Sequence, residues 1–248
     1  MKILLFDLET SPLVGYVWGK YDQTVPEFVR DWHILSFSYK WLGKPVKAHS
    51  LPDFRLYKKD RHNDRELVKK LWELINEADV LVAHNGIDFD IKRANARFSF
   101  HGLKPPAPYK VVDTLKILRK NFSFTSNKLD DVSKQLGFGA KLKHEGIGLW
   151  IKCLDGDRKS WRKMVQYNKR DVVLLEKLYL YLLPWISNHP NQNLYSEGSV
   201  CPKCASPKLH ARGYVRTLAG VFRKFQCQKC GGWSRGKQNV HKIDLLNG

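Results

Sequence analysis

The sequence predicts an α/β domain with a mixed sheet flanked by helices, followed by a small β domain near the carboxyl end. Three observations lead to this fold class. Apolar runs of strand length alternate with amphipathic runs of helical length over residues 1–187. Three strand-like runs come early, which favours a mixed sheet over a purely parallel one. Beyond residue 199 the chain changes to two cysteine pairs joined by short strand-like segments.

The elements of the larger domain follow from these periodicities. We expect strands at 2–8, 33–42, 45–50, 80–84 and 109–113, and helices at 64–78, 89–100, 127–136 and 159–183. Segments 14–30 and 141–157 interrupt the pattern. Residues 188–198 are rich in Asn, Pro and Ser and predict a linker, so the predicted domains are 1–187 and 199–240. An apolar content of 43% is ample for a buried core in the larger one.

Acidic residues recur at the ends of these predicted elements. Asp7 and Glu9 project from one face of the first strand, because side chains at i and i+2 do so. Asp90 opens a predicted helix, and Tyr167 and Asp171 share a face of the last one. Four carboxylates gathered together repel one another unless hard divalent cations such as Mg²⁺ or Mn²⁺ lie between them. Two such ions, roughly 4 Å apart, can activate water for phosphodiester cleavage.

Three motifs carry a resemblance to a known family. FDLET at 6–10, NGIDFD at 85–90 and YNKRD at 167–171 resemble the exonuclease motifs of the DEDD superfamily, the DnaQ-like 3'→5' exonucleases. The tyrosine is typical of the DEDDy branch, in which the chain resembles stand-alone bacterial and phage enzymes. The resemblance covers residues 1–187 and implies a ribonuclease H-like fold. It also implies that the four carboxylates bind two Mg²⁺ or Mn²⁺ ions and that Tyr167 orients or deprotonates the attacking water.

Neighbouring residues have structural interpretations that compete with catalytic ones. The family pattern selects Asp90 over Asp88, which we expect to cap the following helix. His84 lies in an apolar run and is expected to be a hydrogen-bonded core residue. Asp113 could cap a helix or contact a metal, and both interpretations stay open. A free tyrosine has a pKa of about 10, which favours orientation of water by Tyr167 over abstraction of its proton.

The second motif of the chain consists of four cysteines near its carboxyl end. Cys201 and Cys204 form one Cys-x-x-Cys pair, and Cys227 and Cys230 form another after 22 intervening residues. This spacing predicts a zinc ribbon with one structural Zn²⁺, whose strands include 214–216 and 222–225. A disulfide framework is disfavoured because Cys153 would remain unpaired and because we expect no signal peptide. A thioredoxin-type redox pair lacks its βαβ surroundings.

The charge of the chain favours a nucleic-acid partner. The formal net charge is +19, and both predicted domains are basic. In the ribbon, cations alternate with aromatic residues, which suits phosphate contacts and base stacking, although the same aromatics could form the ribbon's core. The expected contacts there are Arg212, Arg216, Arg223, Lys224 and Trp233. Seven more cations precede the third motif and are expected to guide a strand toward the carboxylates: Lys141, Lys143, Lys152, Arg158, Lys159, Arg162 and Lys163.

These features predict a metal-dependent 3'→5' exonuclease that acts on DNA in preference to RNA and releases nucleoside monophosphates. Two alternatives stay open: a structure-selective endonuclease on the same scaffold, and a non-catalytic nucleic-acid-binding adaptor. No segment of the sequence is long and apolar enough to span a bilayer. We therefore expect a cytoplasmic protein of a bacterial or phage-infected cell, with a role in replication or repair.

Overall fold

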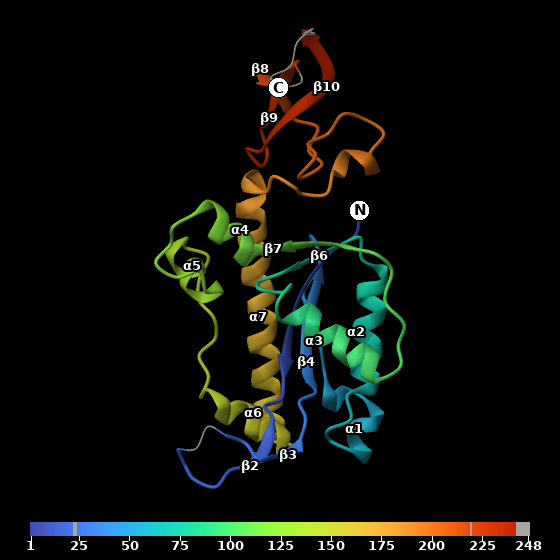
Figure 1. The fold of residues 1–248 in the computed structure, drawn as a ribbon, viewed down its shortest axis with the longest axis vertical. Helices are drawn as coiled ribbons and strands as arrows, with labels where there is room; N and C mark the ends of the chain where they lie inside the picture. Colours follow the sequence, from blue (N-terminus) through green and yellow to red (C-terminus); the bar gives the residue numbers. More distant parts are fainter. Residues whose placement is uncertain (22–23, 219, 242–248) are drawn as a thin grey trace. The chain divides into compact units, whose positions relative to one another are not determined.

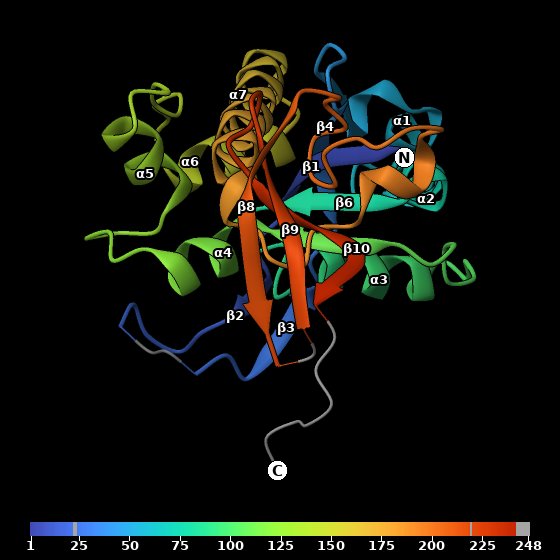
Figure 2. The same cartoon turned by 90° about the horizontal axis from the view of Figure 1, so that it is seen from above.

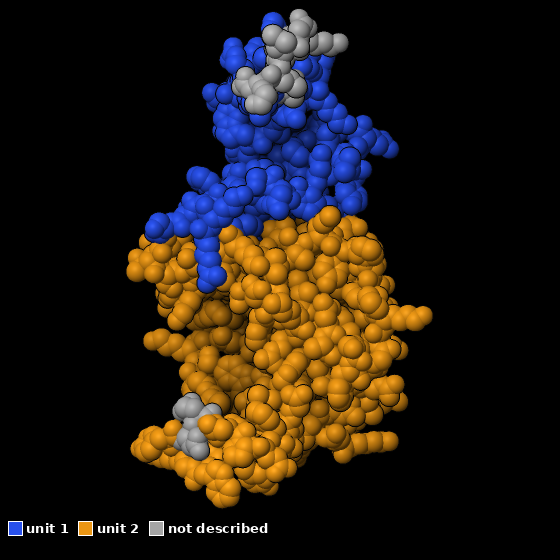
Figure 3. Space-filling view, viewed as in Figure 1, with its two compact units in different colours: residues 1, 117–123, 178–248 blue, residues 2–116, 124–177 orange. Residues whose placement is uncertain are grey.

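The computed structural model describes residues 1–21, 24–218 and 220–241. The chain divides into two compact units, coloured separately in Figure 3. We call residues 2–116 and 124–177 the sheet unit, and residues 1, 117–123 and 178–248 the cysteine unit. Each unit is described by itself below.

The sheet unit is built on a five-stranded mixed sheet, which confirms the predicted fold class. The strand order is β5-β4-β1-β6-β7. β1 pairs antiparallel with β4 and parallel with β6, and Figure 2 shows β1 and β6 side by side. The strands are β1 (Ile3–Thr10), β4 (Ile34–Trp41), β5 (Lys47–Ser50), β6 (Val80–Ala83) and β7 (Lys110–Asp113).

Helices flank this sheet (Figure 1). α2 shows why they do so: its apolar residues recur every three or four positions, and that stripe is buried from Leu67 to Ile75. The longest helix, α7, carries the third motif. The helices are α1 (Arg55–Lys59), α2 (Arg65–Glu77), α3 (Asp90–Phe100), α4 (Thr114–Asn121), α5 (Leu129–Gln135), α6 (Ile147–Leu154) and α7 (Arg158–Leu182).

The centre of the core lies around β1. Leu4, Leu5 and Phe6 are fully buried, because β1 is an inner strand covered on both faces. This accounts for the continuous apolar run in the sequence instead of an alternating one. The first polar residue of the run, Asp7, comes where the strand leaves the deepest part of the core.

The two segments predicted to interrupt the pattern contain structure of their own. Segment 14–30 contains an antiparallel pair, β2 (Val14–Tyr16) and β3 (Glu27–Arg30). Segment 141–157 contains α6. A short 3₁₀ turn, η1 (Leu51–Asp53), follows β5 and begins with a capping box between Ser50 and Asp53.

The cysteine unit contains a three-stranded antiparallel sheet in the order β10-β9-β8. Its strands are β8 (Leu209–Thr217), β9 (Gly220–Cys227) and β10 (Trp233–His241), and two 3₁₀ turns, η2 (Leu183–Trp185) and η3 (Gln192–Tyr195), precede them. The predicted strands 214–216 and 222–225 lie inside β8 and β9. In the part of the chain that the structure describes, every helix is too short or too polar to cross a membrane.

Candidate active site

Strand β1 presents the first two carboxylates. Asp7 and Glu9 lie two residues apart and therefore project from the same face of the sheet. On the neighbouring strand β4, Ser38 stands opposite Asp7 and Ser36 stands opposite Glu9. Both serines are fully buried, and their small side chains leave room beside the carboxylates.

Helix α7 supplies the third carboxylate. Asp171 is 1% exposed, and ligand oxygens of Asp7, Glu9 and Asp171 all lie within 4.8 Å of one another. Within the described residues, Oδ1 of Asp171 is buried without a hydrogen-bond partner. The first and third motifs, which lie far apart in the sequence, therefore meet at one place, as the motif order predicts.

Asp90 is the first residue of α3 and lies beside this group without belonging to the 4.8 Å cluster. Its Oδ1 accepts a hydrogen bond of 3.0 Å from the backbone N–H of Leu8, between Asp7 and Glu9. Gly86 makes the tight turn before it possible, since a Cβ there would come within 2.4 Å of the Cβ of Ala83. The turn thus holds the second motif against β1.

The carboxylates of the site carry strongly perturbed pKa values. Burial is the largest cause for Asp7, and the charges of Asp90, Glu9 and Asp171 raise its pKa further. Burial and Asp171 raise the pKa of Glu9 to about 8, and burial raises the pKa of Asp90 to about 7. These carboxyl groups therefore retain protons at higher pH than ordinary carboxyl groups do, unless a positive counter-charge lies beside them.

Lys141 provides part of that counter-charge. Its Nζ donates to Oδ2 of Asp171 at 2.6 Å and to the hydroxyl of Tyr167 at 3.3 Å. Burial alone would lower the pKa of Lys141, but contact with Asp171 raises it above the ordinary value. The sequence places Lys141 only among cations that could guide a strand; the structure places its ammonium group in the acidic site.

Tyr167 lies one helical turn before Asp171 on the same face of α7. Burial, followed by the charge of Asp171, raises its pKa to about 12. Its ring packs edge-on against His144, with ring centroids 4.7 Å apart, and against Trp150 on α6. A tyrosine in this environment is protonated at neutral pH and can only donate or accept hydrogen bonds, which favours orientation of water over proton abstraction.

Sequence reasoning missed Asn168. This fully buried side chain donates from Nδ2 to Oδ2 of Asp7 at 2.6 Å and to the backbone oxygen of Asp7 at 3.2 Å. It joins α7 to β1 directly behind the carboxylates. Its position inside the third motif is the one signal that could have found it, because an isolated asparagine in a helix predicts nothing specific.

Two neighbouring residues have structural roles. His84 is hydrogen-bonded through both ring nitrogens, to Thr114 Oγ1 at 2.9 Å and the backbone oxygen of Asn127 at 3.0 Å, as expected for a satisfied core histidine. Asp113 accepts from the backbone N–H groups of Asn85, Ile87 and Leu115, so it acts as a cap and turn residue.

The expectation that Asp88 caps α3 is wrong. The helix begins at Asp90, its N-cap residue is Phe89, and no side chain caps it. Asp88 is half exposed and pairs instead with Lys92 and Lys116, each at 3.3 Å. The second motif therefore directs Asp88 toward solvent and Asp90 toward β1.

The donor set fits divalent cations. Carboxylate oxygens are the hard ligands that Mg²⁺ and Mn²⁺ prefer, and the unpartnered Oδ1 of Asp171 offers a further ligand position. Burial and then mutual repulsion raise the pKa values of Asp7 and Glu9, and a cation would offset the repulsion. Asp7, Glu9 and Asp171 are the residues that would hold it, with Asp90 alongside.

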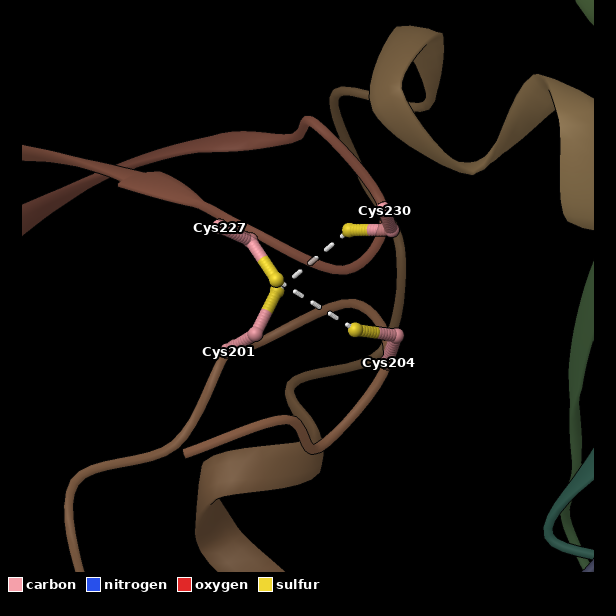
Figure 4. Close-up of side chains that lie close together, drawn as sticks. All are labelled: Cys201, Cys204, Cys227 and Cys230. Atoms are coloured by element: carbon pink, nitrogen blue, oxygen red, sulfur yellow. Dashed lines mark hydrogen bonds between the residues drawn. The ribbon is translucent and has the colours of Figure 1, made fainter. Parts of the chain in front are cut away.

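The four cysteines form a second candidate metal centre. Figure 4 shows the sulfur atoms of Cys201, Cys204, Cys227 and Cys230 turned toward one another from two loops. They lie within 4.8 Å of one another, at 3.7 Å for Cys201 to Cys230 and 3.6 Å for Cys204 to Cys227. All are free thiols, and the arrangement fits tetrahedral Zn²⁺.

The predicted nucleic-acid contacts of the ribbon are distributed over β8, β9 and β10. Arg212, Arg216, Arg223 and Trp233 are exposed. Lys224 stacks on the ring of Trp233 with its Nζ 5.2 Å from the centroid. These side chains lie on one sheet, but within the described residues they do not gather at one site.

Comparisons with known proteins agree with this fold. A family model described as the RNase_H superfamily matches residues 45–183, more than half of the chain. The family B DNA polymerase from the hyperthermophilic archaeon Pyrobaculum calidifontis has a similar structure, with a TM-score of 0.54 and 16% sequence identity. That match covers 74% of this chain and 24% of the polymerase, so the chain spans about a quarter of its length. None of the curated proteins is similar enough in sequence to count as a match.

Proposed function

We propose that this chain, which belongs to the RNase_H superfamily, is a 3'→5' exonuclease of the DEDDy type that hydrolyses DNA and releases nucleoside monophosphates. The observation that carries the proposal is the convergence of Asp7, Glu9 and Asp171 within 4.8 Å, with Tyr167 one turn away on α7. A buried, electrostatically strained acidic cluster suits a nuclease better than a binding protein, because binding nucleic acid requires positive charge.

The roles of the residues follow from their contacts. Asp7, Glu9, Asp90 and Asp171 would hold two Mg²⁺ or Mn²⁺ ions, whose chemistry would be to acidify a water molecule and to stabilise charge on the leaving oxygen. Asn168 fixes Oδ2 of Asp7 by its 2.6 Å hydrogen bond.

Tyr167 and Lys141 act on the other side of the cluster. Tyr167, with its pKa of about 12, keeps its proton and orients the water by hydrogen bonding. Lys141 holds both the tyrosine hydroxyl and Asp171, so it positions the two α7 side chains relative to each other.

The cysteine unit has a supporting role in this proposal. Cys201, Cys204, Cys227 and Cys230 would hold one structural Zn²⁺, which would stabilise a sheet too small to form a large core. The exposed Arg212, Arg216 and Trp233 make the same unit suited to hold nucleic acid. The proposed domains are residues 1–187 and 199–240.

The test is degradation of single-stranded DNA labelled at its 5' end, in the presence of Mg²⁺ or Mn²⁺. We expect a ladder that shortens from the 3' end with the native protein and no ladder with Asp90→Asn. The matched control is Asp88→Asn, which changes an exposed aspartate two residues away and should leave the ladder intact. Equal loss in both variants would contradict the assignment of Asp90.

Three further substrates separate the alternatives. Cleavage of circular single-stranded DNA would favour the endonuclease. Faster degradation of an RNA of the same sequence would overturn the preference for DNA. DNA that is bound but never cut, with either metal, would favour the non-catalytic adaptor.

A further inference from the structure

A second concave surface lies on the sheet unit, away from the acidic cluster. It is a groove of about 810 Å³ with β5, η1 and α1 on one wall and α7 on the other. Two cations line it from the first wall, Lys58 and Arg61, and three from α7, Arg158, Arg162 and Lys169. We call it the basic groove.

The positive charge of the basic groove is not neutralised by the protein. Its lining contains one carboxylate, Asp53, whose Oδ2 accepts hydrogen bonds from the backbone N–H and the hydroxyl of Ser50. Among the described residues, no ion pair within 4.0 Å engages any of the five cations. By contrast, Lys152 and Lys163 nearby are both paired with Glu145. An uncompensated cluster of this kind in a concavity attracts polyanions.

The groove is also more ordered than a solvated helix face. The guanidinium of Arg61 donates from Nη1 to the backbone oxygen of Asp155 at 2.8 Å and lies against Gly156. A Cβ at that glycine would come within 2.9 Å of Nη1, and the glycine φ of +88° favours no other residue. Beneath it, Trp161 Nε1 donates to the hydroxyl of Tyr57 at 3.2 Å and joins the two walls.

Helical geometry separates the basic groove from the active site. Arg158, Arg162 and Lys169 follow one another at spacings of four and seven, so they share one face of α7. At about 100° per residue, Tyr167 and Asp171 point to the opposite face. Arg158 and Arg162, which the sequence predicts to guide a strand toward the carboxylates, therefore face away from Tyr167 and Asp171.

The length of the row of cations on α7 favours a polymer of phosphates over a single phosphate as the ligand. Lys169 lies eleven positions after Arg158, which corresponds to about 16 Å of helix at 1.5 Å per residue. One strand of a duplex carries a phosphate about every 3.4 Å along the duplex axis, so a row of this length can face several successive phosphates. A single phosphate or a released mononucleotide would occupy only a fraction of it.

We propose that the basic groove binds the phosphate backbone of a nucleic acid, at a segment away from the end that enters the acidic cluster. The inference rests on the proposed function for the identity of the polymer, since an acidic protein segment would also carry negative charge. Groove contacts add affinity for long substrates and make that affinity salt-dependent.

The test compares two double variants with the same change of charge. Arg162→Ala with Lys169→Ala removes two groove cations, and Lys104→Ala with Lys110→Ala removes two exposed cations near β7, at the opposite edge of the sheet from β5. Binding of a fluorescent 30-bp DNA duplex is measured by anisotropy in EDTA over a range of salt concentrations. Arg61→Ala serves as a single variant from the other wall.

We expect the slope of log Kd against log salt to fall by about 0.9 for each phosphate that the variant no longer neutralises, hence by about 2 in the groove double variant and about 1 in Arg61→Ala. The control double variant should keep the native slope. Slopes equal to the control in both groove variants would overturn the proposal. Native DNA binding combined with lost binding of a polyglutamate peptide would also overturn it, in favour of an acidic protein segment.

This readout does not depend on hydrolysis. A native protein that binds the duplex through the groove cations but never cuts DNA would refute the proposed exonuclease and support the groove. If the native protein cuts DNA and the groove variants keep the native salt dependence of binding, the exonuclease is supported and the groove proposal is refuted.

Discussion

Replacing Lys141 with methionine tests whether its ammonium group balances the acidic cluster. In the native protein, Lys141 Nζ lies 2.6 Å from Asp171, whose side chain is 2% exposed, while that of Lys141 is 28% exposed. Methionine keeps the length and apolar stem of the side chain but removes the charge. Asp171 then remains buried without its cation, next to Asp7 and Glu9.

The expected loss of stability in Lys141→Met follows from the burial of its ion pair with Asp171. Removing one partner of a buried ion pair costs about 3–5 kcal/mol, and the partial exposure of Lys141 places this case near 3 kcal/mol. For a chain of this size, 1 kcal/mol shifts Tm by about 2–4 °C, so the expected loss is about 6–12 °C. The control is Lys70→Met, which breaks an i,i+3 pair with both side chains at least 40% exposed and should cost less than about 1 kcal/mol.

The Tm values of both variants are measured by thermal unfolding in EDTA. The double variant Lys141→Met with Asp171→Asn completes a double-mutant cycle for this ion pair. Removing both charges should recover part of the loss, because the uncompensated carboxylate is gone. Added Mn²⁺ should narrow the gap between Lys141→Met and the native protein, since a bound cation replaces the ammonium charge. A Lys141→Met protein that loses no more stability in EDTA than Lys70→Met would refute the reasoning.

Three further predictions concern other parts of the chain. Tyr167→Phe should lower kcat on DNA by about 100-fold through misplacement of the water, while stabilisation by Mn²⁺ persists; an unchanged kcat would contradict the orienting role. Burial lowers the pKa of His33 to about 4 in the folded protein. Below about pH 6.5 the unfolded state therefore binds a proton that the folded state does not, and the free energy of unfolding decreases as the pH is lowered. Urea denaturation should show native stability dropping by about 2.5 kcal/mol more than that of His33→Leu between pH 7.5 and 4.5, and parallel curves would exclude this contribution. Elemental analysis should find one zinc per chain, lost in Cys204→Ser, and a zinc-free native protein would refute the zinc site.

The elements that sequence predicts well are those whose burial pattern is long and regular. β1 and β6 are inner strands with continuous apolar runs, and α2 and α7 carry long stripes at helical spacing. The missed elements are short: α6 has eight residues, of which Leu149 and Cys153 are buried, and α1, β2 and β3 lack buried stripes. α1 has five residues and none is buried, and β2 and β3 are short strands with mostly exposed side chains. Their structure depends on contacts with the rest of the fold.

The second motif contains a residue, Asp88, whose role was predicted wrongly from local sequence. An aspartate directly before a predicted helical run is a reasonable N-cap, which is why the sequence predicts that role for Asp88. The helix instead starts at Asp90, whose Oδ1 accepts a hydrogen bond from the N–H of Leu8, 82 residues earlier in the chain. This contact with a distant strand is invisible to a local capping rule.

The contacts of α7 explain why the acidic cluster and the basic groove need opposite helix faces. Asp171 is flanked in sequence by Lys169 and Arg170, yet its partner is Lys141 from a loop thirty residues earlier. Arg170 donates to the backbone oxygen of Ala140 at 2.9 Å, and Lys169 lines the groove. A second cation on the face of Asp171 would pair with the carboxylates and compete with a divalent ion for them. Lys163 lies one turn before Tyr167 but pairs with Glu145, and Arg158, Arg162 and Lys169 line the groove, so these cations leave the carboxylates available to metal.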